Sequence, residues 1–290
     1  MKRYKGKLII SDLDGTLIPR GGIISKENKE AIGHFVSEGG LFAIATGRTP
    51  EAAAGYVEGL PINAPSVFFN GAILYDWQAG RVLKTLPLTA GDGQNLWPAF
   101  AREALRRFPE ACLEVYTQDN CHVVTPEEND DPRLPHEYYR YAHTALEQLT
   151  DTAKTPWLKF FACDKHEHLE EYVALAEEMG VAPLANGFYS EDNYYEFVAD
   201  GVSKGSLLAT IRELLPGIEI IAAGDYLNDK EMLANADTSA APANAHQEIR
   251  AAAKLKGPAV EDHLLAWLVD QLADGTYSYD RKTGSWQEKK

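Results

Sequence analysis

Two aspartates, Asp12 and Asp14, combine a residue type and a spacing that suit nucleophilic and acid-base chemistry. They lie in the segment 12–16 (DLDGT), directly after the apolar run Lys7–Ser11, which predicts a buried strand. Residues that follow a strand of an open α/β sheet face the ligand crevice, and Gly15 lets the chain turn sharply there. Beside a metal ion Asp12 stays ionised and can attack phosphorus, while Asp14 can protonate the leaving oxygen and then deprotonate water.

A second acidic segment, 224–229 (GDYLND), predicts a site for a hard cation. It follows the expected strand Ile218–Ala222, so Asp225 stands at the strand end and Asp229 about one helical turn further on. Mg²⁺ prefers carboxylate, carbonyl and water oxygens as ligands. Because both acidic segments follow strands of one predicted sheet, we expect them to meet at one edge of that sheet.

Two further segments predict groups that bind a phosphate. Thr46 and Gly47 follow the expected strand Leu41–Ala45, where the Thr46 hydroxyl and nearby backbone N–H groups can donate to phosphate oxygens. A strand-to-helix turn with Thr46 as its cap explains the same residues. Lys204 is expected in the first turn of a helix at Ser203–Leu215, where the helix dipole disfavours a cation. Neutralising phosphate and carboxylates together explains that position, and so does a solvated lysine.

Together these segments resemble the haloacid dehalogenase (HAD) superfamily, and more closely the Cof-type phosphatases with a C2-type cap. The resemblance covers about residues 8–272, but its specificity lies in a few motifs. They are Ser11–Leu17, Ala45–Arg48, Asn70–Ala72, Val202–Gly205, Gly224–Asp229 and the pair Asn244-Ala245. Ser11 departs from the family pattern, which usually has an aromatic or aliphatic residue at that position.

The resemblance implies roles for named residues. It implies that Asp12 is the nucleophile that becomes aspartyl-phosphate and that Asp14 is the general acid and base. It also implies Mg²⁺ as the cofactor, held by the Asp12 carboxylate, the Asp14 main-chain carbonyl and Asp225. The other implied site residues are those that bind the phosphoryl group, Thr46, Gly47, Lys204 and Asn228, and those that support the site, Asp229, Arg48 and Asn70. For Arg48, a contact to the pocket and a structural ion pair remain open.

The elements that must position these residues alternate between strand and helix at both ends of the chain. Short apolar strands followed by amphipathic helices are typical of a parallel sheet covered on both faces. The expected strands are Lys7–Ser11, Leu41–Ala45, Ser66–Phe69 and Ile218–Ala222. The expected helices are Lys26–Glu38, a segment from Thr49 to Gly59, Ser203–Leu215, Asp229–Ala236 and Glu261–Ala273. The fold class is therefore α/β, with the Rossmann-like parallel-sheet core that the HAD resemblance implies.

The middle of the chain predicts a second, α+β domain inserted into the first. Its expected elements are a helix at Leu88–Phe108, a hairpin of Leu113–Tyr116 and His122–Thr125, helical segments at Glu137–Leu149 and His166–Met179, and a strand at Leu158–Ala162. We expect a discontinuous core at 1–86 and 191–275, a cap at 87–190 and a polar tail at 276–290. The inserted domain lies between Arg48 and Lys204, and this position identifies it as a C2-type cap, which closes over the site and selects the substrate.

The composition limits the partners of this protein. A formal net charge of −15 disfavours binding to nucleic acid or to a membrane surface, because both are polyanionic. No window approaches the roughly 18 apolar residues of a membrane span. The three scattered cysteines predict reduced thiols and a cytoplasmic location. Tyrosines 138, 139, 141, 194 and 195 could line a sugar or ring pocket, although packing explains such residues more often.

The sequence therefore predicts Mg²⁺-dependent hydrolysis of a small phosphate monoester, with sugar phosphates as the first expectation. A phosphotransferase or phosphomutase that uses the same aspartyl-phosphate is the alternative with the same chemistry. A noncatalytic phosphate or Mg²⁺ sensor on the same fold is a further alternative, although a sensor does not need a proton donor at Asp14. The physiological substrate and the oligomeric state stay open at this point.

Overall fold

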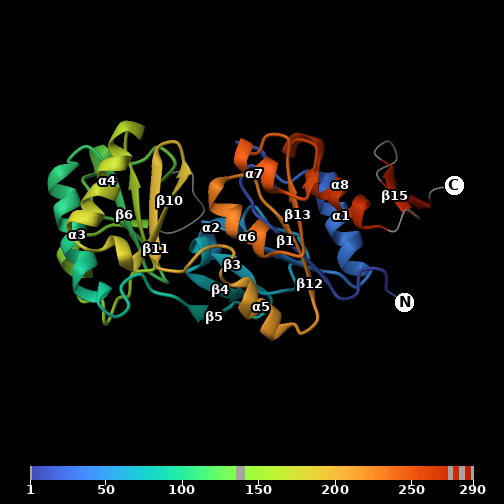
Figure 1. The fold of residues 1–290 in the computed structure, drawn as a ribbon, viewed down its shortest axis with the longest axis horizontal. Coiled ribbons are helices and arrows are strands. Elements are labelled where there is room, and N and C mark those ends of the chain that lie inside the picture. The colour runs from blue at the N-terminus through green and yellow to red at the C-terminus, as the bar shows by residue number, and fades with distance from the viewer. Residues whose placement is uncertain (1, 135–140, 274–276, 281–284, 289–290) are drawn as a thin grey trace.

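The computed structural model describes residues 2–134, 141–273, 277–280 and 285–288 and has two domains that lie side by side (Figure 1). The core domain is built on a five-stranded parallel sheet, in the order β14-β13-β12-β1-β2. Its strands are β1 (Lys7–Ser11), β2 (Leu41–Ile44), β12 (Glu219–Ala223), β13 (Thr238–Ala241) and β14 (Leu255–Lys256). The expected Rossmann-like parallel sheet is confirmed.

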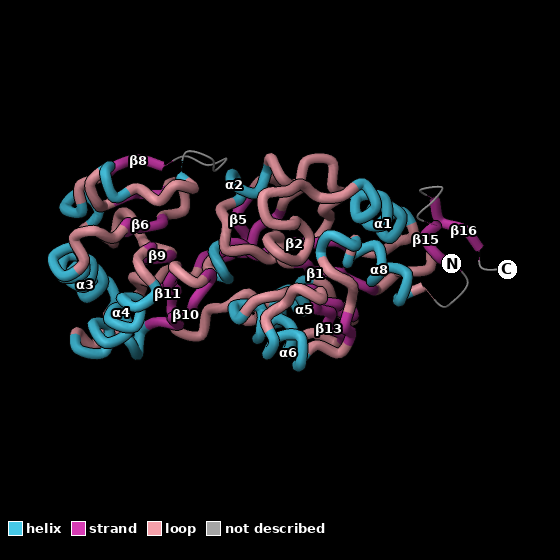
Figure 2. Tube along the Cα trace, turned by 90° about the horizontal axis from the view of Figure 1, so that it is seen from above, coloured by secondary structure: helices cyan, strands magenta, loops and turns pink. Residues whose placement is uncertain are grey.

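Helices cover both faces of the core sheet because its strands are apolar on both sides. Leu8 and Ile10 of β1 pack with α5 (Leu208–Leu214), α6 (Lys230–Asn235) and α7 (Gln247–Ala252). The residue between them, Ile9, packs on the opposite face, which α1 (Lys26–Ser37) and α8 (Leu264–Leu272) cover. Figure 2 shows α1 and the pair α5 and α6 on opposite sides of this sheet. One short helix, α2 (Pro50–Ala54), begins after the cap residue Thr49.

The cap domain is built on a six-stranded sheet in the order β10-β11-β9-β6-β7-β8, antiparallel except for the parallel pair β7 and β8. Its strands are β6 (Cys112–Tyr116), β7 (Cys121–Val123), β8 (Tyr141–His143), β9 (Lys159–Cys163), β10 (Ala185–Glu191) and β11 (Tyr194–Ala199). Helices α3 (Gly93–Arg107) and α4 (His166–Glu178) pack on one face around Trp97, Phe160 and Tyr172. The sheet lies between these helices and the core domain (Figure 1).

A small antiparallel sheet leads from the core to the cap. The strand expected at Ser66–Phe69 forms, but it belongs to this sheet and not to the parallel core sheet, because it pairs with a second strand that the sequence patterns do not predict. The small sheet consists of β3 (Ser66–Phe68), β4 (Ile73–Asp76) and β5 (Arg81–Thr85). A single parallel bridge between Ala45 and Val67 joins it to the end of β2. In the other half of the core, β13 and β14 were also not expected.

Among the described residues no helix is long and apolar enough to cross a membrane.

Several expected elements differ in the structure. The helix expected from Thr49 to Gly59 ends at Ala54, and the helix expected at Leu88–Phe108 begins only at Gly93. The helical segment at Glu137–Leu149 is wrong in its described part, which forms strand β8 and a short 3-10 helix at Leu146–Leu149, while 135–140 lie outside the described residues. The helix expected at Ser203–Leu215 begins only at Leu208, because Ser203 caps a tight turn first: its Oγ accepts hydrogen bonds from the N–H groups of residues 205 and 206. The tail after Gly275 contains two paired strands, Tyr277–Asp280 and Ser285–Glu288.

The expected boundary after residue 190 falls inside the cap sheet. Strand β10 ends at Glu191, and β11 pairs with both β10 and β9 as far as Ala199. Sequence spacing alone does not fix this boundary, because the apolar and aromatic run Tyr194–Ala199 suits a strand of either domain. We propose that the inserted domain continues to Ala199.

Candidate active site

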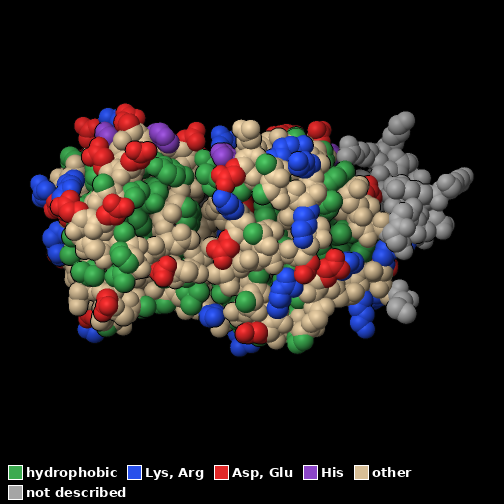
Figure 3. All heavy atoms as spheres, viewed as in Figure 1, with side chains coloured by type: hydrophobic (Ala, Val, Ile, Leu, Met, Phe, Trp, Pro, Cys, Tyr) green, Lys and Arg blue, Asp and Glu red, His purple; other side chains and the backbone are tan. Residues whose placement is uncertain are grey.

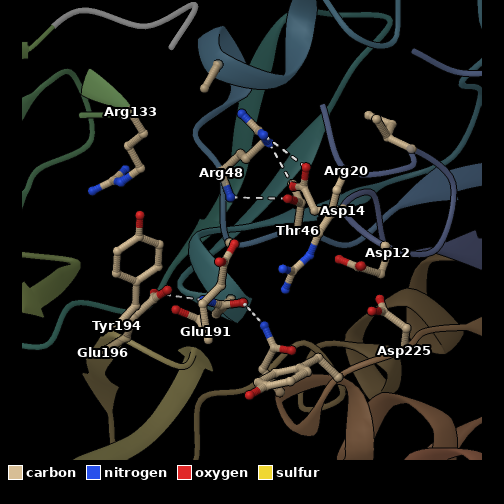
Figure 4. A pocket seen from close by; sticks show the side chains of 18 of the residues that line it. Asp12, Asp14, Arg20, Thr46, Arg48, Arg133, Glu191, Tyr194, Glu196 and Asp225 are labelled. Atoms are coloured by element: carbon tan, nitrogen blue, oxygen red, sulfur yellow. Dashed lines mark hydrogen bonds and ion pairs between the residues drawn. The ribbon is translucent and has the colours of Figure 1, made fainter. Parts of the chain in front are cut away.

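A cavity of about 730 Å³ opens between the carboxyl ends of the core strands and the cap sheet. On the face seen in Figure 3, acidic and basic side chains lie next to one another where the two domains meet. Residues of both domains line the cavity, and Figure 4 shows the acidic and basic groups that converge in it. The expected site residues that line it are Asp12, Asp14, Thr46, Gly47, Arg48, Asn70, Lys204, Asp225 and Asn228. Asp229 is fully buried beside them.

Asp12 follows β1 at the base of the cavity and is only 5% exposed. Its N–H donates to the Ala223 carbonyl of the neighbouring strand (2.9 Å), which continues the sheet register by one residue. Burial raises the pKa of Asp12, and the ammonium of Lys204 opposes this shift. The Ser11 hydroxyl donates to the Asp12 carbonyl at 2.7 Å, so the departure from the family pattern at this position is satisfied locally.

Lys204 connects two buried carboxylates. Its Nζ lies 2.7 Å from Asp12 Oδ1 and 2.8 Å from Asp229 Oδ1, and its side chain is 2% exposed. Burial alone would lower the pKa of Lys204, but the two carboxylates raise it above its ordinary value, so the ammonium stays charged. The helix dipole does not disfavour a cation at this position, because the helix begins only at Leu208. The two carboxylates explain why a lysine stands here.

Three carboxylates, those of Asp12, Asp225 and Asp229, come within 4.8 Å of one another. Asp229 already accepts hydrogen bonds at both oxygens: from Lys204 at Oδ1, and from the N–H groups of Asp225 (2.9 Å) and Tyr226 (3.1 Å) at Oδ2. It therefore orients the segment that carries Asp225. Burial and the nearby Asp229 raise the pKa of Asp225 to about 6. Like charges at this spacing repel one another, and an all-oxygen donor set suits a hard divalent cation.

The turn after β1 requires a glycine for two separate reasons. Gly15 has φ +85°, and a Cβ on it would lie 2.3 Å from Asp225 Oδ2. The Asn244 side-chain amide donates to its carbonyl at 2.8 Å. The backbone of Gly15 therefore packs directly against the carboxylate cluster.

Gly15→Ala is expected to destabilise the protein more than Gly6→Ala. Gly6 has nearly the same φ, +84°, but a Cβ added to it would meet no atom within 4 Å. Gly6→Ala therefore measures the cost of positive φ without the cost of a close contact. Positive φ costs a non-glycine residue roughly 1–2 kcal/mol, and the contact with Asp225 should add about 1 kcal/mol or more. Urea unfolding of both variants measures the difference; equal losses of unfolding free energy would contradict a cost of close approach to Asp225.

The loop after β2 presents donors to the cavity. The Thr46 carbonyl accepts from the Asn70 N–H at 3.0 Å, which leaves the Gly47 N–H on the opposite side of that trans peptide. The Thr46 hydroxyl accepts from the Arg48 N–H at 3.2 Å. Because Thr46 and Gly47 both line the cavity, a hydroxyl and a backbone N–H lie where an anion could be bound.

Arg48 forms a two-pronged ion pair with Asp14. Its Nε and Nη2 lie 2.8 and 2.9 Å from the two carboxylate oxygens, and its guanidinium packs 4.4 Å from the ring centre of Tyr56. Figure 4 shows the Asp14 carboxylate turned toward Arg48. Arg48 thus both lines the cavity and makes an ion pair, so the two alternatives for this residue hold together.

Several cavity residues from the cap were not identified from the sequence. They include Arg133, Lys159, Glu191 and Glu196, and the core loop adds Arg20. A signal for two of them exists: Lys159 and Glu196 are single charged residues within apolar strands. Tyr194 lines the cavity, whereas its neighbour Tyr195 packs in the cap core. Tyr138 and Tyr139 lie outside the described residues.

Known proteins resemble this chain over almost its whole length. It is 26% identical to 5-amino-6-(5-phospho-D-ribitylamino)uracil phosphatase YwtE of Bacillus subtilis, covering 94% of this chain and 100% of that protein. It is 26% identical to pyridoxal phosphate phosphatase YbhA of Escherichia coli, covering 86% and 92%. A solved haloacid dehalogenase-like hydrolase from Bacteroides thetaiotaomicron superposes with a TM-score of 0.76 at 23% identity, covering 92% and 100%.

The family comparison agrees with the fold and with the motifs. The family described as haloacid dehalogenase-like hydrolase matches residues 9–267, which include both halves of the core and the cap between them. The parallel core sheet with an inserted α+β cap is also the fold of the solved relative. The chain therefore belongs to the haloacid dehalogenase-like hydrolase family, and the identification drawn from its motifs, a phosphatase of this superfamily, is confirmed.

Proposed function

We propose that this protein hydrolyses a small phosphate monoester through an aspartyl-phosphate on Asp12, with Mg²⁺ as cofactor. The observation that supports this most directly is the contact of 2.7 Å between the buried Asp12 and Lys204, at the base of a cavity whose wall carries Thr46 and Gly47. A carboxylate that must attack an anionic ester needs a cation beside it, and the donors on the wall suit the phosphoryl oxygens.

The reaction proceeds in two displacements. The Asp12 carboxylate attacks phosphorus, the bond from phosphorus to the leaving oxygen breaks, and Asp14 gives that oxygen a proton. Asp14 then takes a proton from water, which attacks the aspartyl-phosphate and releases inorganic phosphate, so that Asp12 is regenerated. Asp14 must turn from Arg48 for these transfers, because the ion pair engages both of its oxygens.

The residues fit a divalent cation at the acidic cluster. The Asp12 carboxylate, the Asp14 main-chain carbonyl and Asp225 would hold Mg²⁺, with Asp229 in support. The ion would offset the repulsion between the anionic nucleophile and the anionic ester. Lys204 adds a fixed positive charge, which a protein of net charge −15 needs at a site for anions.

Sugar phosphates are the first substrate class that we propose, and a phosphate ester that carries a flat ring is the second. The curated relatives named above act, by their names, on a phosphorylated ribitylaminouracil and on pyridoxal phosphate. In this chain Tyr116, Phe161 and Tyr194 line the cavity, and the Arg133 guanidinium lies 4.5 Å from the ring centre of Phe161. Such faces favour stacking with a ring. A cytoplasmic location, which the free cysteines favour, suits a metabolite of either kind.

A panel of phosphorylated metabolites with Mg²⁺ tests this function and orders the two substrate classes. Release of inorganic phosphate is measured for sugar phosphates, pyridoxal phosphate and 4-nitrophenyl phosphate. We expect kcat/KM for one class to exceed that for the other by about tenfold or more, because the two classes differ in the leaving group, which the cap residues that line the cavity would contact.

The same assay separates the alternatives. A phosphotransferase or phosphomutase would move the phosphoryl group to an added alcohol or sugar faster than it releases inorganic phosphate. A sensor would bind phosphate without turnover of any ester. Either result would overturn hydrolysis as the function.

A further inference from the structure

Two charged residues of the cap are buried where the cap meets the phosphate-binding loop. Lys159 of β9 and Glu196 of β11 are each 3% exposed, and their side chains lie 2.8 Å apart. Burial alone would raise the pKa of Glu196, but Lys159 lowers it below its ordinary value, so the Glu196 carboxylate keeps its charge. Removing two charges from water is unfavourable unless further polar partners surround them. Two of those partners, Gly47 and Asn70, lie in the core.

Each member of the pair contacts a different part of the core loops. The Lys159 ammonium donates to the Gly47 carbonyl at 3.3 Å. Glu196 Oε2 accepts from the side-chain amide of Asn70 at 2.8 Å, and Asn70 Oδ1 in turn accepts from Asn228 at 3.2 Å. A continuous chain of hydrogen bonds thus runs from the cap strands to expected phosphate-binding residues.

These contacts act on backbone that could otherwise take other conformations. The peptide between Gly47 and Arg48 is held from both sides, since Lys159 binds its carbonyl and Thr46 Oγ1 accepts from its N–H. Asn70 has φ +53°, and the residue before it, Phe69, also has a positive φ of 52°. Two consecutive non-glycine residues in this region persist only where surrounding contacts determine them. Glu196 supplies such a contact through the Asn70 side chain.

We propose that the Lys159–Glu196 pair is a latch by which the closed cap positions the loop 46–48 and Asn70 for binding the phosphoryl group. Both members are positioning residues, because they act through Gly47 and Asn70. The latch rests on the proposed function in one respect, the binding of phosphate at this loop. It makes phosphate affinity, a property of core residues, depend on two residues of the cap.

The first test removes each charge while keeping the side-chain size. Lys159→Met and Glu196→Gln are compared with the wild type, all as full-length chains with Mg²⁺. We expect the Kd for inorganic phosphate to rise at least tenfold and kcat/KM for 4-nitrophenyl phosphate to fall at least tenfold. Tyr172→Phe is the control, since it removes a partly buried cap hydrogen bond to Asp164 (3.0 Å) on the helix side of the cap sheet. It should lower the Tm and leave phosphate affinity within twofold.

The second test exchanges the partners. Asn70→Asp alone places two carboxylates together and should weaken phosphate binding at least tenfold. The double variant Asn70→Asp/Glu196→Gln keeps the total charge, because one carboxylate is gained and one is lost. In it the amide at position 196 can donate to the carboxylate at position 70, and the oxygen of that amide can accept from Lys159. The double variant should recover at least half of the larger single loss on a logarithmic scale. If the loss of phosphate affinity in the double variant equals the product of the losses in the two single variants, the latch is overturned.

Hydrogen exchange decides the latch independently of phosphate binding. The N–H groups of Arg48 and Asn70 are bonded within the loop that the latch holds. Their exchange should be at least tenfold faster in Glu196→Gln than in Tyr172→Phe, and equal exchange in the two variants would refute the latch. If the wild type neither binds phosphate nor hydrolyses 4-nitrophenyl phosphate, the proposed function fails, and the difference in exchange still decides whether the latch exists.

Discussion

Asp12→Asn is expected to lower the turnover of every phosphate ester by about 10⁴-fold or more, because the neutral amide cannot attack phosphorus to form the aspartyl-phosphate. The substitution keeps the size of the side chain, so binding of inorganic phosphate should persist. Phosphate release from 4-nitrophenyl phosphate measures the effect. Asp92→Asn, at an exposed position before α3, is the matched control and should stay within twofold of the wild type.

The same variant should keep its stability although it loses activity. Burial raises the pKa of Asp12, which means that its charge is disfavoured at this position, and Lys204 retains Asp229 as a partner when the charge is removed. Thermal unfolding should therefore give a Tm close to that of the wild type or above it. Near-wild-type turnover by Asp12→Asn, in a preparation free of contaminating phosphatase, would rule out the covalent mechanism.

Removal of divalent metal should abolish turnover, and Mg²⁺ should restore it. Ca²⁺ should substitute poorly, because its longer and less regular coordination does not hold the nucleophile and the ester in line. Asp225→Asn should lower turnover at saturating Mg²⁺ by about 10²-fold or more, whereas the control Asp92→Asn should respond to Mg²⁺ as the wild type does. A rate that chelation leaves unchanged would show that the acidic cluster has another role.

The Mg²⁺ requirement should also depend on pH in a defined direction. In the metal-free protein the pKa of Asp225 is about 6, so below this pH a proton competes with the ion for the carboxylate. The apparent affinity for Mg²⁺ should weaken as the pH falls through about 6 and level off above it. Titrations of activity with Mg²⁺ between about pH 5 and pH 8 measure this. An affinity that does not change over that range would contradict the assignment of Asp225.

The sequence by itself determined the α/β class of the core, with a parallel sheet covered on both faces, and the residues of the acidic cluster. Leu8, Ile9 and Ile10 are apolar in succession, which requires cover on both faces of the sheet, and helices provide it. Asp12 and Asp225 follow β1 and β12, and these strands are neighbours in a parallel register. Their proximity follows from the strand ends, which the sequence indicates, and from the adjacency of β1 and β12, which the structure supplies.

Sequence patterns predicted secondary structure and sheet membership less well where one segment suits two environments. The segment before Leu149 has helical spacing, yet Tyr141–His143 pairs with β7 as an edge strand of the cap. Tyr194–Ala199 continues the cap sheet instead of returning to the core. In both cases the partner strand decided the outcome, and a partner distant in sequence leaves no periodic signal of its own.

Only the tertiary structure decided which charged side chains meet across the cavity. Arg48 is far from Asp14 in the chain and binds both of its oxygens, and the cap pair of Lys159 and Glu196 contacts the core loops. A charge within an apolar strand indicates that a partner must exist, because burying it alone is unfavourable. Which partner it finds depends on how two separate sheets face each other, and that arrangement is a property of the assembled molecule.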